Sequence, residues 1–129
     1  MNYLLDTHTF FWTAVEPSRL PSGVYAAISD DSNSIGVSIA SFWEMAIKAN
    51  IGKWDLPITL QDLRQFTQDE YIQILPITVE ATEIVRNLPL HHSDPFDRII
   101  IATALIDGAV VLSVDDKLDA YEGLRRFWA

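Results

Sequence analysis

Four carboxylates in the sequence stand at the end or the start of an apolar segment, where functional groups are often placed. They are Asp6, Glu44, Asp97 and Asp115. If the fold brought these four acids together without a counterion, they would raise one another's pKa values and lower the stability of the chain. A divalent cation removes that cost, and Mg²⁺ or Mn²⁺ prefers oxygen ligands while keeping places for water and substrate phosphates. Such a centre can activate water for attack on a phosphodiester.

Short apolar runs alternate with helical patterns along the chain, which favours an α/β fold with a mostly parallel sheet. Strands are expected at 3–5, 35–38, 71–75, 109–113 and, as a last edge strand, 127–128. Helices are expected at 8–15, 22–29, 42–50, 60–68, 79–87 and from 95 up to Gly108, with a short helical turn at 118–121. Right-handed crossovers would put helices on both faces of the sheet. Because sites form beyond the carboxyl ends of parallel strands, we expect the four acids to meet at one edge.

The helix that begins at Pro95 is apolar on almost every side, so we expect it to be buried. Asp94 is typical of an N-cap, and Pro95 of the first helical position. Asp97 then lies in the first turn, where the helix dipole favours a negative charge. Capping alone could explain both acids, with Asp97 reaching back to the cap as in a capping box, although that motif prefers Glu or Gln.

Glu44 also has a purely structural explanation. Ser41 and Glu44 have the spacing of a capping box, and Glu44 and Lys48 have the spacing and order of a helical ion pair. The functional interpretation gains weight because one acid on each element at the same edge is harder to attribute to capping than any one of them alone.

The composition limits the possible function classes. A chain of 129 residues, 49% of them hydrophobic, is expected to form one domain with a real core. The absence of cysteine excludes disulfides and thiolate metal sites, and it fits a reducing cytoplasm. The net charge of -9 argues against sequence-blind binding along a nucleic-acid backbone, although metal ions can supply the positive charge that phosphates need. No leader and no apolar run of about 18 residues is visible, so we expect no membrane association.

Four stretches of the sequence together carry a family resemblance. They are LLDTH at 4–8, SFWEMAIK at 41–48, LPLHHSDPFDR at 88–98 and LSVD at 112–115. Each alone is a weak signal, but the ordered set covers nearly the whole chain, and Asp-Pro-Phe-Asp-Arg is its sharpest piece. On these residues the chain resembles the PIN-domain ribonucleases, and most closely the VapC-type toxins of bacterial type II toxin–antitoxin systems.

The resemblance implies a single PIN domain over residues 1–129, built as a three-layer α/β/α sandwich that cuts RNA with Mg²⁺ or Mn²⁺. Asp6 and Asp97 would be direct metal ligands, and Glu44 and Asp115 would hold the metal or its waters, directly or in the second shell. Metal-activated water would attack the phosphate, and the 3′ oxygen would leave. The resemblance further implies a cytoplasmic homodimer held inactive by a cognate antitoxin protein.

The polar neighbours of the four acids have structural explanations as well. Asp94 is the better candidate for a cap, and Asp116 for a solvated turn residue. Ser113 and Thr7 could each hydrogen-bond an acid or a ligand water, and Thr7 could equally cap the first helix.

The basic candidates are weaker. His8, His91 and His92 lack the mutual spacing of a Zn²⁺ site, so we interpret them as loop or core residues, with His92 the one that could lie near substrate. Arg98 could contact a phosphate or form a surface ion pair. Arg125 and Arg126 are too few for a nucleic-acid patch.

One alternative belongs to a different class: a non-catalytic PIN-like or receiver-like α/β module that binds a partner. A receiver domain needs paired acids at the first strand and a Lys after a late strand, but Asp6 stands alone and no such Lys is present. A dehalogenase-type phosphatase would want Asp-x-Asp after the first strand, and the second Asp is missing here. The ribonuclease interpretation is therefore preferred.

Overall fold

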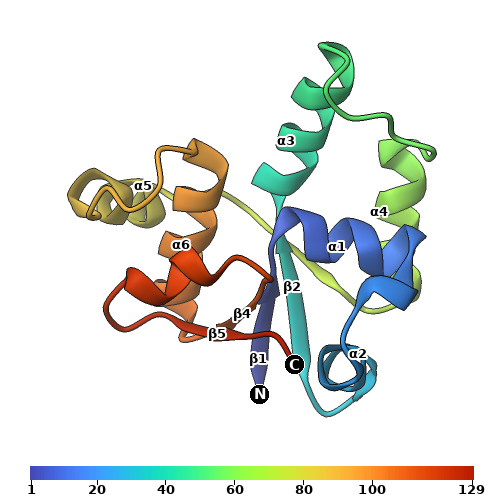
Figure 1. Cartoon of the computed structure of the whole chain (residues 1–129), viewed down its shortest axis with the longest axis horizontal. Coiled ribbons are helices and arrows are strands. Elements are labelled where there is room, and N and C mark those ends of the chain that lie inside the picture. The colour runs from blue at the N-terminus through green and yellow to red at the C-terminus, as the bar shows by residue number, and fades with distance from the viewer.

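The computed structural model describes residues 1–129 and contains one five-stranded sheet in which every pairing is parallel. The strands are β1 (Asn2–Leu5), β2 (Ser34–Ser38), β3 (Gln73–Leu75), β4 (Val110–Leu112) and β5 (Arg125–Phe127). Their order across the sheet is β3-β2-β1-β4-β5, so β1 is central (Figure 1). The predicted α/β class with a parallel sheet is confirmed, and the predicted strands differ only at their ends.

Helices cover both faces of this sheet. They are α1 (Thr7–Val15), α2 (Ser22–Ser29), α3 (Ile39–Asn50), α4 (Leu60–Asp69), α5 (Val79–Asn87) and α6 (Pro95–Asp107), with short 3₁₀ helices η1 (Pro17–Arg19) and η2 (Asp116–Ala120). Figure 1 shows α5 and α6 on one side and α1, α2 and α4 on the other, which confirms the three predicted layers. None of the helices has the length and hydropathy needed to cross a membrane.

The strands divide the apolar core into two layers because successive side chains point to opposite faces. Leu4 and Val111 pack in the layer with α6, whereas Leu5 and Leu112 pack in the layer with α1, α2 and α4. Each central strand is covered on both sides, which is why these segments are continuous apolar runs and not alternating ones.

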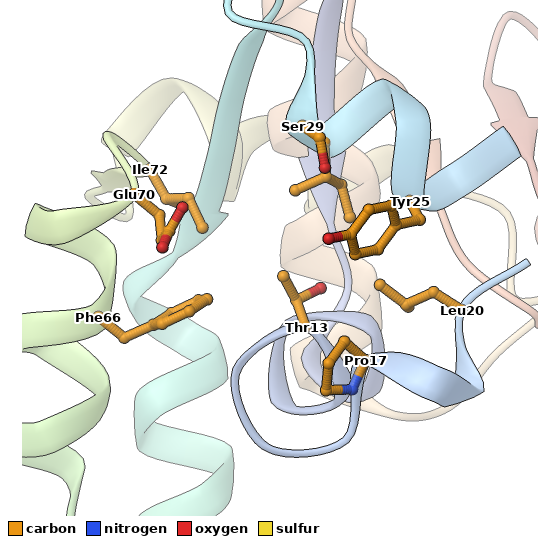
Figure 2. Close-up of a pocket in the computed structure, with 9 residues that line it drawn as sticks. Thr13, Pro17, Leu20, Tyr25, Ser29, Phe66, Glu70 and Ile72 are labelled. Atoms are coloured by element: carbon orange, nitrogen blue, oxygen red, sulfur yellow. The ribbon is translucent and has the colours of Figure 1, made fainter. Parts of the chain in front are cut away.

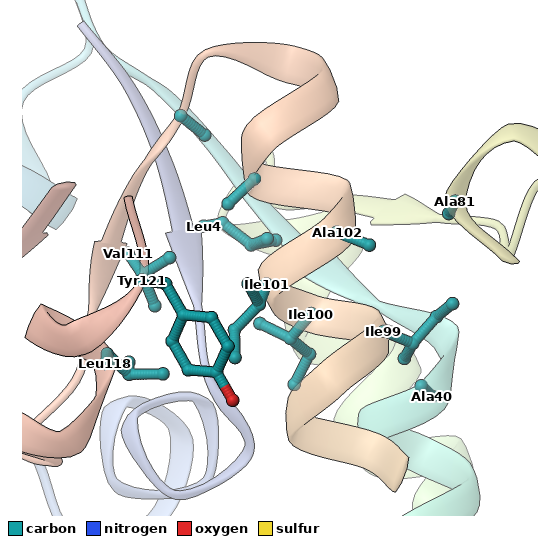
Figure 3. Packing of buried hydrophobic residues seen from close by; sticks show 12 residues of the cluster. Leu4, Ala40, Ala81, Ile99, Ile100, Ile101, Ala102, Val111, Leu118 and Tyr121 are labelled. Atoms are coloured by element: carbon teal, nitrogen blue, oxygen red, sulfur yellow. The ribbon is translucent and has the colours of Figure 1, made fainter. Parts of the chain in front are cut away.

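Helix α6 is the buried helix that its sequence predicts. Every residue from 98 to 104 is buried. Figure 3 shows Ile101 directed toward Leu4 and Tyr121, and Ile99 toward Ala40 of α3. At its start, Asp94 caps the helix by accepting hydrogen bonds from the N–H groups of residues 96 and 97 at 2.8 and 3.0 Å, as predicted. The carboxylate of Asp97 takes no part in this cap, so the capping-box explanation of Asp97 is wrong.

Two other helix starts differ from the sequence prediction by a few residues. Helix α3 begins at Ile39, and Ser38 is its cap, with its Oγ accepting from the N–H of Ala40 at 3.0 Å. Ser41 therefore lies inside the helix and forms no capping box with Glu44.

Helix α1 begins at Thr7, so Asp6 is its cap and Thr7 is not. In both cases the helix starts directly at the strand end, without the intervening loop residues that we expected.

Arg98 is neither a surface ion-pair residue nor free to contact a phosphate, and both predicted roles are wrong. The residue is only 8% exposed, although it follows Asp97 directly. Its guanidinium donates hydrogen bonds to backbone carbonyl oxygens of residues 85, 88, 89 and 92, at 3.3, 2.8, 2.8 and 3.2 Å. Because five N–H donors in a planar fork can serve several acceptors at once, Arg98 fixes the loop between α5 and α6.

Replacing Arg98 with Met should destabilise the fold by about 2–4 kcal/mol, because the side-chain volume is kept while buried carbonyls lose their donors. Chemical denaturation followed by circular dichroism would measure the free energy of unfolding. Arg86→Met is the control, since Arg86 forms only an exposed ion pair with Glu83 and should have little effect. Equal stabilities of the two variants would contradict the structural role of Arg98.

Candidate active site

The strand order creates a natural position for a site. The chain adds β2 and β3 on one side of β1, then crosses over and adds β4 and β5 on the other side. Helical connections therefore leave the neighbouring strands β1 and β4 in opposite directions, and open α/β sheets bind ligands beyond the carboxyl ends of such strands. Asp6 follows β1 directly, and Asp115 lies just past β4. Two of the four acids thus flank this point.

Asp6 is both the cap of α1 and a member of this edge. Its Oδ1 accepts a hydrogen bond from the N–H of Thr9 at 2.9 Å. Burial raises the pKa of Asp6, and hydrogen bonds from Ser113 and Thr9 offset that rise only in part. Ser113 is fully buried, and its Oγ also accepts from the N–H of Asp115 at 3.0 Å. The Ser113 hydroxyl therefore connects Asp6 to the turn that carries Asp115, in line with one of its two predicted roles.

Asp97 is partly buried beside other acids. Its pKa is raised to about 7, first by burial and then by the nearby charges of Asp94, Glu44 and Asp6, while His92 acts in the opposite direction. The four residues that act on Asp97 come from segments spread over most of the chain. Asp94 is thus a cap whose charge also raises the pKa of Asp97.

Glu44 points from α3 into the same region and is almost completely buried, at 3% exposed. Its Oε1 accepts from the Thr7 hydroxyl at 2.6 Å, and Thr7 Oγ1 lies 3.0 Å from Ser41 Oγ. Its Oε2 pairs with Lys48 Nζ at 2.5 Å, so the predicted ion pair within the helix is confirmed. Two donors therefore fix the carboxylate, and Thr7 contacts an acid, as one of its two predicted roles requires.

Asp115 is held by His92, a contact that the sequence did not predict. His92 Nε2 lies 2.8 Å from Asp115 Oδ2, and the imidazole is 7% exposed. Burial would raise the pKa of Asp115, but hydrogen bonds from His92 and from the N–H of Lys117 outweigh it and lower that pKa. Donor atoms of His92, Asp97 and Asp115 all lie within 4.8 Å of one another. His92 is therefore a site residue and not simply a loop or core residue.

From the sequence we named His92 as the histidine that could lie near substrate, but no sequence pattern predicts its contact with Asp115. The spacing between His92 and Asp115 is set by the α6–β4 crossover, so only the fold reveals the contact.

His91 instead packs edge-on against Tyr121, with ring centroids 4.8 Å apart. His8 is exposed and stacks on Trp54 at 4.8 Å, and Asp116 lies exposed in η2. These three residues remain outside the cluster, as we expected.

A pocket lined mostly by hydrophobic residues lies elsewhere in the fold. It is lined by residues of α1, α2 and α4, and none of the four acids borders it. Figure 2 shows Phe66 of α4 and Tyr25 of α2 on opposite sides, with Thr13 of α1 between them. The chemistry of this protein is expected instead at the end of the sheet where Asp6, Glu44, Asp97 and Asp115 lie, which we call the acidic edge. This edge is open to solvent through the half-buried Asp97 and Asp115.

The residues at the acidic edge fit a hard divalent cation. Three of the groups that act on the Asp97 carboxylate are other carboxylates, and the nearby lysine, Lys48, is already paired with Glu44. Carboxylate oxygens in this excess are the donors that Mg²⁺ and Mn²⁺ prefer. A bound cation would relieve the repulsion that raises the pKa of Asp97.

Comparison with known proteins places the chain in a family. The PIN domain family model matches residues 3–124. Ribonuclease VapC22 of Mycobacterium tuberculosis is 31% identical over 120 residues, which cover 92% of this chain and 90% of that protein. The chain therefore belongs to the PIN domain family, and the resemblance to VapC-type proteins is confirmed.

Solved structures share the fold. VapBC2 from Rickettsia felis, bound to a DNA fragment from its promoter, matches with a TM-score of 0.72 at 16% identity, covering 100% of both chains. DNA-bound VapBC from Salmonella typhimurium matches with a TM-score of 0.66 at 17% identity, covering 98% of this chain and 97% of that one. At these identities the likeness establishes the PIN fold and nothing further.

Metal binding should depend on pH because Asp97, whose pKa is about 7, must lose its proton to coordinate a cation. Mn²⁺ affinity should be about tenfold weaker at pH 6 than at pH 8, with release of about one proton at the lower pH. Isothermal titration calorimetry in buffers of different ionisation enthalpy measures both quantities. Asp31→Asn, in an exposed loop, is the control and should keep this dependence. An affinity that does not change from pH 6 to pH 8 would rule out this role for Asp97.

Proposed function

We propose that this protein is a metal-dependent endoribonuclease and the toxin of a type II toxin–antitoxin system. The observation that supports this most directly is the gathering of carboxylates from separate elements of a PIN fold around Asp97 and Asp115. The name of its relative, Ribonuclease VapC22, points to the same activity. A parallel sheet is suited to metal-assisted hydrolysis when such a cluster lies where the connections leave neighbouring strands in opposite directions.

In this proposal Asp6 and Asp97 are direct ligands of Mg²⁺ or Mn²⁺, and Glu44 and Asp115 hold the metal or its waters. When bound, the metal would activate water for attack on an RNA phosphodiester. Thr7 and Lys48 orient the Glu44 carboxylate, and Ser113 fixes Asp6 relative to the Asp115 turn. These side chains set the positions of the ligands before any substrate arrives.

The charge of the protein bears on how RNA would approach. The net charge is -9, and the guanidinium of Arg98 is occupied by backbone carbonyls. The chain therefore offers little positive charge for general backbone binding, and a bound metal would carry most of the phosphate contact. We infer a structured, specific RNA target, cut in the cytoplasm.

The proposal includes a cognate antitoxin, in keeping with the VapBC complexes that share the fold, and also a homodimer. Large apolar side chains on one side of α3 are exposed and offer a surface for protein contact. They are Ile39, Trp43 and Ile47 of α3 and its C-cap residue Ile51, at intervals of four residues. Trp43 is 59% exposed, a large apolar side chain to leave in water without a partner.

Replacing Asp6 or Asp97 with Asn should reduce RNA cleavage at least a hundredfold while leaving the fold intact, because a ligand charge is lost and the side-chain shape is kept. Cleavage of a pool of structured RNAs by the purified protein, freed of any partner, would be compared in Mg²⁺, Mn²⁺ and EDTA.

Asp31→Asn is the matched control for these variants, since it removes an exposed carboxylate away from the acidic edge. It should cut at the wild-type rate in Mg²⁺ or Mn²⁺ and not in EDTA. Wild-type cleavage by Asp97→Asn would refute the assignment of the site. A folded, partner-free protein that binds antitoxin but cuts nothing would favour the non-catalytic module.

A further inference from the structure

His92 is held by hydrogen bonds through both its ring and its backbone. Its ring Nδ1 lies 3.1 Å from the Tyr121 hydroxyl, and its Nε2 lies 2.8 Å from Asp115 Oδ2. Its backbone N–H donates to the same Tyr121 hydroxyl at 3.0 Å, and its carbonyl accepts from Arg98 at 3.2 Å. Tyr121 itself is 3% exposed and belongs to the apolar layer around α6.

The hydrogen bonds at the Tyr121 hydroxyl decide which ring nitrogen of His92 carries the proton. The hydroxyl already accepts from the backbone N–H of His92, so its own proton is available for Nδ1. With Nδ1 accepting, the neutral ring must carry its proton on Nε2. That N–H then points at a carboxylate oxygen, which is the favourable partner. The opposite tautomer would set a bare nitrogen against the Asp115 carboxylate.

Both oxygens of Asp115 are engaged by this arrangement. Oδ2 faces His92 Nε2, and Oδ1 accepts from the N–H of Lys117 at 3.1 Å. The plane of the carboxylate is therefore fixed at two points, although the side chain is 37% exposed and would otherwise rotate freely. Each oxygen keeps a further lone pair that can accept.

We propose that His92 is a positioning residue that donates from Nε2 to Asp115 and is not itself a metal ligand. Tyr121 sets the tautomer of the ring, and Arg98 anchors the backbone that carries it. The inference rests on the proposed function in one respect, that Asp115 belongs to the metal centre. It assigns to the segment between α5 and α6 the task of orienting an acid contributed from beyond β4. The donor set of the centre then remains all oxygen, which suits Mg²⁺ and Mn²⁺.

The tautomer is tested directly by ¹⁵N NMR of histidine-labelled, metal-free protein. The expected result is a neutral His92 ring protonated on Nε2, and a ring protonated on Nδ1 would overturn the proposal. In Tyr121→Phe the proton of the hydroxyl is lost while the packing is kept, so the form protonated on Nδ1 should be more populated than in the wild type. Tyr71→Phe, at a fully exposed tyrosine, is the control and should leave the His92 signals unchanged.

Mn²⁺ affinity, followed by electron paramagnetic resonance, separates a positioning role from ligation. His92→Ala and Tyr121→Phe should weaken binding at least about tenfold, the usual effect of removing a group that orients a ligand. His92→Gln should stay close to wild type, because its amide can place an N–H near the position of Nε2. Binding by His92→Gln as weak as by His92→Ala would instead make His92 a ligand and overturn the proposal.

Asp97→Asn separates failure of this inference from failure of the proposed function. If Asp97→Asn loses Mn²⁺ while His92→Ala and Tyr121→Phe bind it as the wild type does, only the positioning role is refuted. If the wild type binds no Mn²⁺, or Asp97→Asn binds it normally, the metal centre and the positioning role are refuted together. Tyr121→Phe retains the buried ring, so it answers the question even if His92→Ala fails to fold.

Discussion

Mutual repulsion of carboxylates is the constraint on which the carboxyl edge of this sheet depends. Asp97 is partly buried and lies near other carboxylates, and its pKa is raised to about 7 as a result. A folded chain tolerates such an arrangement only if other interactions compensate for it or a cation relieves it. The rest of the structure can be understood as the means by which the chain holds these groups at one place.

The compensation comes from groups that serve the fold and the edge together. Asp6 caps α1, Glu44 pairs with Lys48 inside α3, and Asp94 caps the helix that carries Asp97. Each structural contact also fixes the position of a carboxylate. Structural and functional explanations of these acids are therefore compatible, and the spacing of a cap or an ion pair does not count against a role in the site.

Local sequence patterns predicted the parts of the fold that depend on nearest neighbours. The Asp94–Pro95 start of α6, the bounds of α2 and α5, and the Glu44–Lys48 pair depend on residues within a few positions of one another. The alternation of strands and helices predicted the parallel sheet. A parallel sheet in turn predicts that Asp6 and Asp115 lie at one edge.

Contacts that depend on the tertiary arrangement could not be predicted in this way. Arg98 looked available for a phosphate, because nothing in the sequence shows that the preceding loop turns its carbonyls toward the guanidinium. His92 meets Asp115 across 23 positions of sequence, through a crossover whose geometry is set by packing. The start of α3 was misplaced because Ser38 and Ser41 are equally good caps in isolation, and only the end of β2 decides between them.

Anomalous diffraction from crystals soaked in Mn²⁺ is the most direct test of the account, since it locates the ion without reference to activity. We expect a peak in contact with the carboxylates of Asp6 and Asp97, with Asp115 close by and His92 still hydrogen-bonded to Asp115. A peak confined to other acids, such as the exposed Asp30 and Asp31 loop, or no peak at the carboxyl edge, would contradict it.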